Sequence, residues 1–75
     1  MTPADRAEIV WMEQDRKKRG WQIRLWVGEE VIKYRPPEPA PGREADEELL
    51  RSATVEAARL DGFELNPDAV TIHRP

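Results

Sequence analysis

The sequence predicts a small α+β domain in which one helix packs on one face of an antiparallel sheet. Three observations support this class: a glycine turn between two strand-like segments, a helix-like segment at 43–61, and a short alternating segment near the C-terminus. A chain of 75 residues has the size of one domain with a small core. We therefore expect a single domain over 1–75, with a proline-rich connector at 36–42 that lacks backbone donors for a sheet.

The best-specified element is a β-hairpin over 21–35. Gly28-Glu29 is a two-residue loop that begins with glycine, as in type II′ turns, which require positive φ at that position. The turn predicts a register that sets Arg24 opposite Lys33 and Leu25 opposite Ile32. The face expected to form the core carries Trp21, Ile23, Leu25, Val27, Ile32 and Tyr34. The second face has no acidic residue and carries Gln22, Arg24, Trp26, Val31, Lys33 and Arg35.

The N-terminal segment 2–19 has two interpretations. As a helix, it begins with Thr2 as the cap and Pro3 in the first helical position, ends at Gly20, and has cations in its last turn. As a strand, it covers Ile9–Gln14, because Ile, Val and Trp in succession favour pleated surfaces. We favour the helix, although the pattern leaves the strand open.

A helix at 2–19 has a consequence for the second face of the hairpin. It can lie over that face, with Trp11 packed on Trp26 and with Glu8 or Asp15 beside the cations. The sequence alone does not determine whether the face is covered or exposed.

The segment 43–61 predicts the main helix. Its apolar stripe is expected to consist of Leu49, Ala53, Ala57 and Leu60, with Leu50 at the margin, and to pack on the core face of the hairpin. The acids Glu44, Asp46, Glu47 and Glu48 suit the positive N-terminal end, and Gly62 suits a left-handed stop. After a turn at Asn66-Pro67-Asp68, Val70 and Ile72 alternate with polar residues in a final strand. We expect this strand to run parallel to 30–35 and to pair with 21–27.

The composition excludes several functional classes. Without cysteine, the chain has no disulfide framework, no thiolate metal site and no cysteine nucleophile. One histidine, His73, and one serine, Ser52, lie far apart in the predicted elements, and no glycine-rich phosphate loop is present. We therefore expect no catalytic residues, no cofactor and no metal, and hence not an enzyme. The longest apolar run, Ile9–Met12, is far shorter than a membrane span, and a cytoplasmic location is expected.

The only patterned surface of one charge lies around the second hairpin face. Its candidate binding residues are Arg24, Trp26, Lys33 and Arg35, with the cations Arg16, Lys17, Lys18 and Arg19 nearby in sequence. Aromatic rings among cations are typical of single-stranded nucleic-acid sites, but the net charge of -3 argues against general binding of polyanions. We expect a small non-catalytic binding or adaptor protein that acts on a protein partner. A nucleic-acid-binding module is the alternative, and the oligomeric state is not determined by the sequence.

Overall fold

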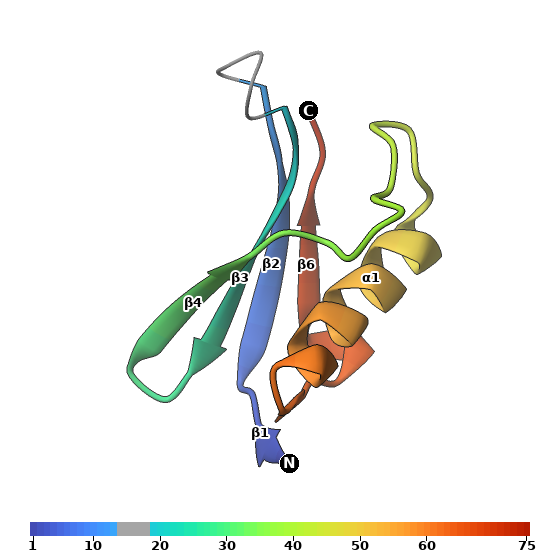
Figure 1. The fold of residues 1–75 in the computed structure, drawn as a ribbon. Helices are drawn as coiled ribbons and strands as arrows, with labels where there is room; N and C mark the ends of the chain where they lie inside the picture. Colours follow the sequence, from blue (N-terminus) through green and yellow to red (C-terminus); the bar gives the residue numbers. More distant parts are fainter. Residues whose placement is uncertain (14–18) are drawn as a thin grey trace.

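The computed structural model describes residues 1–13 and 19–75 and has one helix beside a mixed sheet (Figure 1). The elements in chain order are β1 (Thr2–Pro3), β2 (Arg6–Met12), β3 (Gly20–Val27), β4 (Glu30–Tyr34), α1 (Glu47–Leu60), β5 (Phe63–Glu64), the 3-10 turn η1 (Pro67–Ala69) and β6 (Val70–His73). The main sheet has the order β4-β3-β2-β6. The predicted α+β class is confirmed.

The β3–β4 hairpin has the predicted register. Val27 pairs with Glu30, Leu25 with Ile32 and Arg24 with Lys33. Gly28 has a φ of 60°, the left-handed value that the turn requires. Its N–H donates a 2.8 Å hydrogen bond to Oδ2 of Asp5, so the N-terminal segment also holds the turn.

The predicted N-terminal helix is wrong. Residues Arg6–Met12 form β2, which pairs antiparallel with β3 and parallel with β6. The strand interpretation is therefore the correct one, although β2 begins three residues before Ile9. With a partner on each side, the backbone groups of β2 are satisfied in the sheet, and this pairing outweighs the helix-start signals at Thr2 and Pro3.

The neighbour of the final strand also differs from the prediction. β6 lies in the direction expected, parallel to β4, because it is parallel to β2 and two antiparallel steps separate β2 from β4. However, it pairs with β2 and not with 21–27. β2 occupies the position beside β3, and β6 adds to the other edge of β2.

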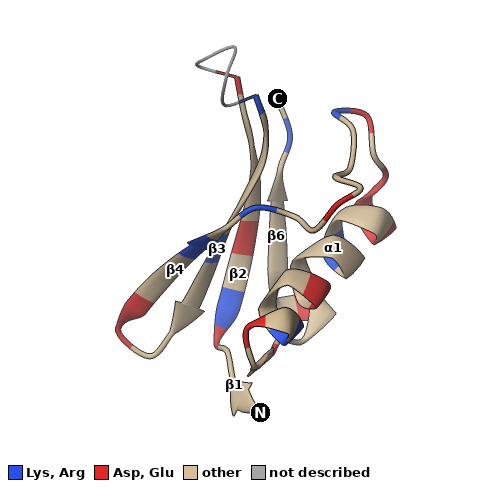
Figure 2. Cartoon of the chain, in the orientation of Figure 1, with Lys and Arg blue, Asp and Glu red and all other residues tan. Residues whose placement is uncertain are grey.

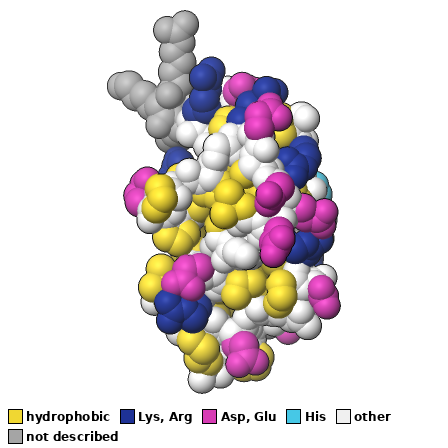
Figure 3. All heavy atoms as spheres, turned by 90° about the vertical axis from the view of Figure 1, so that its right-hand side faces the viewer, with side chains coloured by type: hydrophobic (Ala, Val, Ile, Leu, Met, Phe, Trp, Pro, Cys, Tyr) yellow, Lys and Arg dark blue, Asp and Glu magenta, His cyan; other side chains and the backbone are white. Residues whose placement is uncertain are grey.

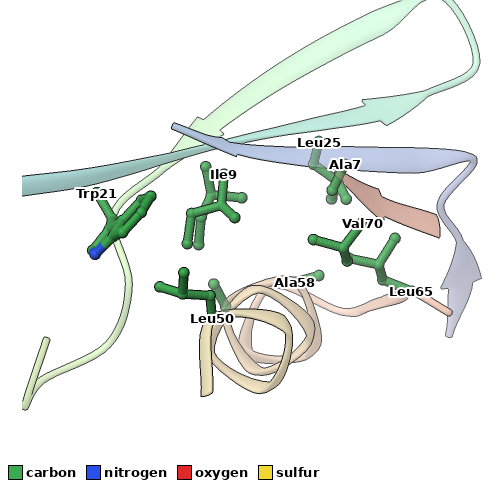
Figure 4. Close-up of a cluster of buried hydrophobic side chains, with 10 residues drawn as sticks. Ala7, Ile9, Trp21, Leu25, Leu50, Ala58, Leu65 and Val70 are labelled. Carbon is green, nitrogen blue, oxygen red and sulfur yellow. The ribbon is translucent and has the colours of Figure 1, made fainter. Parts of the chain in front are cut away.

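The core lies between α1 and one face of the sheet (Figure 4). Ile9, Ile23 and Leu25 from the strands and Leu50 from α1 are 0% exposed. The expected helix stripe is partly wrong, since Leu49 is 51% exposed and Leu60 is 65% exposed. The buried helix residues are Leu50, Thr54, Ala57 and Ala58. The helix is thus rotated so that Leu50 faces the sheet, and it lies over β2 and β6 rather than over the hairpin.

The helix begins later than the sequence predicts, at Glu47 rather than near residue 43. Asp46 is the N-cap, and its Oδ1 accepts a 2.8 Å hydrogen bond from the N–H of Leu49. The predicted stop is confirmed, because Gly62 follows the helix with a φ of 86°.

Two further contacts hold the connector and the N-terminal strand in place. The connector is held by Trp21, whose indole Nε1 donates a 2.8 Å hydrogen bond to the carbonyl oxygen of Gly42. β1 pairs parallel with β5 directly after α1.

In the described ranges 1–13 and 19–75, no helix has the length and apolar character needed to cross a membrane.

Candidate binding face of the sheet

The sheet has a second face, opposite α1, which we call the open face. Alternation along β2, β3, β4 and β6 places on it Arg6, Glu8, Val10, Met12, Gln22, Arg24, Trp26, Val31, Lys33, Thr71 and His73. All these residues are half-buried or exposed, whereas the alternate residues Ala7, Ile9, Ile23 and Leu25 are buried. Within residues 1–13 and 19–75, no helix or strand packs on the open face. An N-terminal helix over this face, one of the two possibilities left open by the sequence, is not formed, because Arg6–Met12 is a strand of the sheet.

A row of charged residues crosses the middle of the open face. Lys33 on β4 pairs in register with Arg24 on β3, and Arg24 pairs with Glu8 on β2. Directly opposite residues of an antiparallel pair have Cβ atoms about 4.5–5.5 Å apart, so the two cations lie side by side. Glu8 supplies the anionic neighbour that two adjacent cations require.

The neighbouring row contains the only tryptophan of the open face. Trp26 pairs with Val31 on one side and with Arg6 on the other. The guanidinium carbon of Arg6 lies 3.8 Å from the centre of a Trp26 ring, which is a cation–π contact. Val31 is 47% exposed, so an apolar and aromatic strip runs beside the charged row.

Glu8 contacts two side chains, those of Arg6 and His73, on the β2–β6 side of the open face. Its Oε1 accepts a 3.3 Å hydrogen bond from Nη1 of Arg6 and lies 3.7 Å from Nε2 of His73. The side chains of Glu8 and His73 are 23% and 48% exposed. The carboxylate therefore offsets part of the positive charge of the face.

The structure brings together three of the four predicted binding residues. Arg24, Trp26 and Lys33 lie on adjacent strands of the open face, whereas Arg35 follows the end of β4. Arg35 lines a shallow groove with Tyr34, Pro37, Ala57, Leu60 and Asp61, beside α1. The other predicted cations Arg16, Lys17 and Lys18, and the expected partner Asp15, lie outside the described residues.

Sequence reasoning missed Arg6 and placed Glu8 on a helix. The alternation of side chains in 6–12 could have placed them on a strand, because the apolar residues Ala7, Ile9 and Trp11 stand at every second position. Trp11 also differs from its expected contact. It packs edge-on against Trp21, with ring centroids 5.3 Å apart, on the core side and not against Trp26.

The opposite side of the molecule carries mixed charge (Figure 2). Arg51 pairs with Glu47 at 2.7 Å, and Arg59 pairs with Glu56 along α1. The Arg59 guanidinium lowers the pKa of the Glu56 carboxyl through a hydrogen bond, and the same contact raises the pKa of Arg59. Seen from this side, acidic, basic and hydrophobic side chains are interspersed (Figure 3), so positive charge is not concentrated there.

The two residues of interest for nucleophilic chemistry lie on different sides of the sheet. Ser52 is exposed on α1, and His73 is on the open face beside Glu8. Among the described residues, no three His, Cys, Asp or Glu side chains are close enough together to hold a metal ion.

The comparisons with known proteins add no relative: no family model, no curated protein and no solved structure matches this chain.

Proposed function

We propose that this domain is a non-catalytic binding module whose open face binds single-stranded nucleic acid. The observation that carries the proposal is the placement of Trp26 next to Arg24 and Lys33 on a sheet face that no described helix or strand covers. Aromatic rings beside cations bind single strands through stacking and phosphate contacts, and neither contact requires a particular sequence.

Each part of the open face has a role in this proposal. Arg24 and Lys33 contact phosphates, and in the described part of the chain neither forms an ion pair. Trp26 and the guanidinium of Arg6 form one stacked platform on which a base can lie, since guanidinium planes and indole rings both stack on bases. Val31 extends the apolar strip toward the edge of the sheet.

Glu8 limits the affinity of the face. Its carboxylate lies next to Arg24 in register and binds Arg6, so it repels phosphate and occupies one of the cations. Removing this charge is therefore expected to strengthen binding, which is the opposite of the effect expected for the cations.

A protein partner, the first expectation from the sequence, stays a prediction. That expectation rests on the lack of predicted catalytic groups and on the charge-rich surface of a small domain. The segment that could have covered the second face as a helix lies in the sheet as β2. We prefer nucleic acid as the ligand because segment 6–12 lies within the sheet, which leaves the basic and aromatic side chains of the open face accessible. An acidic protein segment is the competing ligand for the same cations.

The proposal is tested by titrating the domain with a short single-stranded oligonucleotide at two salt concentrations. Trp26→Ala is expected to weaken binding by about 1–3 kcal/mol, because a base loses its stacking partner. Lys33→Ala should lower the slope of log affinity against log salt by about 1. Glu8→Gln should tighten binding severalfold at the lower salt concentration.

The matched control is Arg43→Ala, which removes one exposed cation on the helix side and should leave binding unchanged. Poly-glutamate is titrated in parallel as a model of an acidic protein segment. The proposal is refuted if no oligonucleotide binds at low salt. It is also refuted if poly-glutamate binds as tightly as the oligonucleotide and Trp26→Ala has no effect on either.

A further inference from the structure

The two edges of the main sheet differ in how their backbone groups are used. Next to the β6 edge, Nη1 of Arg51 donates hydrogen bonds of 2.6 Å and 2.7 Å to the carbonyl oxygens of Pro67 in η1 and of Val70, the first residue of β6. At the β4 edge, no side chain or strand of the described residues bonds to the outward backbone groups of Glu30–Tyr34. The turn end of the hairpin also points away from α1 (Figure 1).

The outward backbone groups of β4 can be assigned from its register. Val27 and Glu30 flank the two-residue turn and form a hydrogen-bonded pair across it. Bonded and non-bonded pairs alternate along an antiparallel ladder, so Glu30, Ile32 and Tyr34 bond to β3. The N–H and C=O groups of Val31 and Lys33 therefore point outward, where another strand could pair with them.

The charges along this edge are separated. Glu29 and Glu30 stand at its N-terminal end, Val31 and Ile32 in the middle, and Lys33 and Arg35 at its C-terminal end. A lysine on an exposed edge usually discourages pairing. Here an antiparallel copy of the same strand sets the acidic half against the basic half, whereas a parallel copy would oppose like charges.

We propose that β4 is a self-association edge, at which two copies of this chain pair antiparallel about Ile32. In this register Ile32 lies opposite Ile32 of the second copy, and Val31 lies opposite Lys33 in a bonded pair. All five residues of β4 are then paired, and Glu29 faces Arg35 of the second copy. Val31, 47% exposed in the single chain, also loses its free edge.

The geometry of the pair has a consequence for the open face. A two-fold axis perpendicular to the sheet leaves both open faces on the same side of one continuous sheet. The inference does not depend on nucleic-acid binding, since it rests on the backbone and the charges of β4. The two proposals can therefore fail independently: the chain could dimerise without binding nucleic acid, or bind nucleic acid as a monomer.

Single-cysteine variants test the register, because the chain has no cysteine of its own. Directly opposite residues have Cα atoms about 4.5–5.5 Å apart, which suits a disulfide, while diagonal ones at about 7–8 Å do not. Ile32→Cys should therefore form disulfide-linked dimers in glutathione buffer severalfold faster than Val31→Cys. If the disulfides formed only through random collisions between chains, Val31→Cys would crosslink faster than Ile32→Cys, because Val31 is the more exposed residue. That result would overturn the proposal.

A second test uses only exposed residues and so does not depend on the packing of Ile32. One double variant carries Glu29→Lys and Glu30→Lys, and the other carries Lys33→Glu and Arg35→Glu. In analytical ultracentrifugation the wild type should dimerise, each variant alone should be monomeric, and their mixture should form a heterodimer. A wild type that stays monomeric at millimolar concentration, or variants that dimerise as well alone as in mixture, would overturn the proposal.

Discussion

The hydroxyl of Tyr34 donates a short hydrogen bond to Oδ2 of Asp61 and so ties the end of β4 to the residue that caps the C-terminus of α1. These residues are 27 positions apart in the chain. Elsewhere β4 extends away from the helix, so this contact is a specific link between the hairpin edge and the helix end. It also alters the ionisation of the phenol.

The link predicts a measurable titration. Burial, followed by the hydrogen bond to Asp61 and the negative charge of that carboxylate, raises the pKa of Tyr34 to about 12. Tyr34 is the single tyrosine, so the ultraviolet absorbance of phenolate reports on it alone. Asp61→Asn should bring the pKa partly back toward 10, while Asp68→Asn, a change to another exposed acid, should not. A wild-type value near 10 in the folded protein would contradict the contact.

The same shift gives the sign of a pH effect on stability. Because the pKa of Tyr34 is higher in the folded state than the unfolded value of 10.0, its contribution is complete below pH 10 and is lost as the pH rises through about 12. Urea unfolding at pH 9 and at pH 11 should therefore show a larger loss of stability for the wild type than for Tyr34→Phe.

The placement of the core predicts unequal effects for two leucines. Leu25 is 0% exposed in the core, and Leu25→Ala should lower the free energy of unfolding by about 2–5 kcal/mol through lost burial and a cavity. Leu49 is 51% exposed, and Leu49→Ala should change it by no more than about 0.5 kcal/mol. Equal losses in urea denaturation would mean that α1 presents a different face to the sheet.

Two glycines provide a matched test of the hairpin turn. Gly28 has positive φ and no heavy atom near the position of an added Cβ, so Gly28→Ala should cost about 1–2 kcal/mol through backbone strain alone. Gly42 has equal space without positive φ, and Gly42→Ala should be neutral or slightly stabilising. Thermal unfolding of both variants measures the difference. A neutral Gly28→Ala would show that the turn does not need the left-handed conformation.

The features that depend on neighbouring residues could be predicted from the sequence alone. The hairpin register and its two faces follow from Gly28-Glu29, since a two-residue turn admits one pairing and a period of two then assigns every side chain. The helix and its end at Gly62 follow in the same way from local periodicity and capping. Arg24, Trp26 and Lys33 could therefore be placed on one face of the hairpin from the sequence alone.

The remaining features depend on partners that are distant in sequence, so they follow from the fold and not from local patterns. β2 is a strand because β3 and β6 lie on its two sides. The alternation in 6–12 is compatible with a strand, but it does not identify these two partners. Leu50 rather than Leu49 is buried, because adjacent positions on a helix fit the same apolar period and the location of the sheet selects between them. The open face is accessible for the same reason: once Arg6–Met12 pairs within the sheet, that segment can no longer cover it.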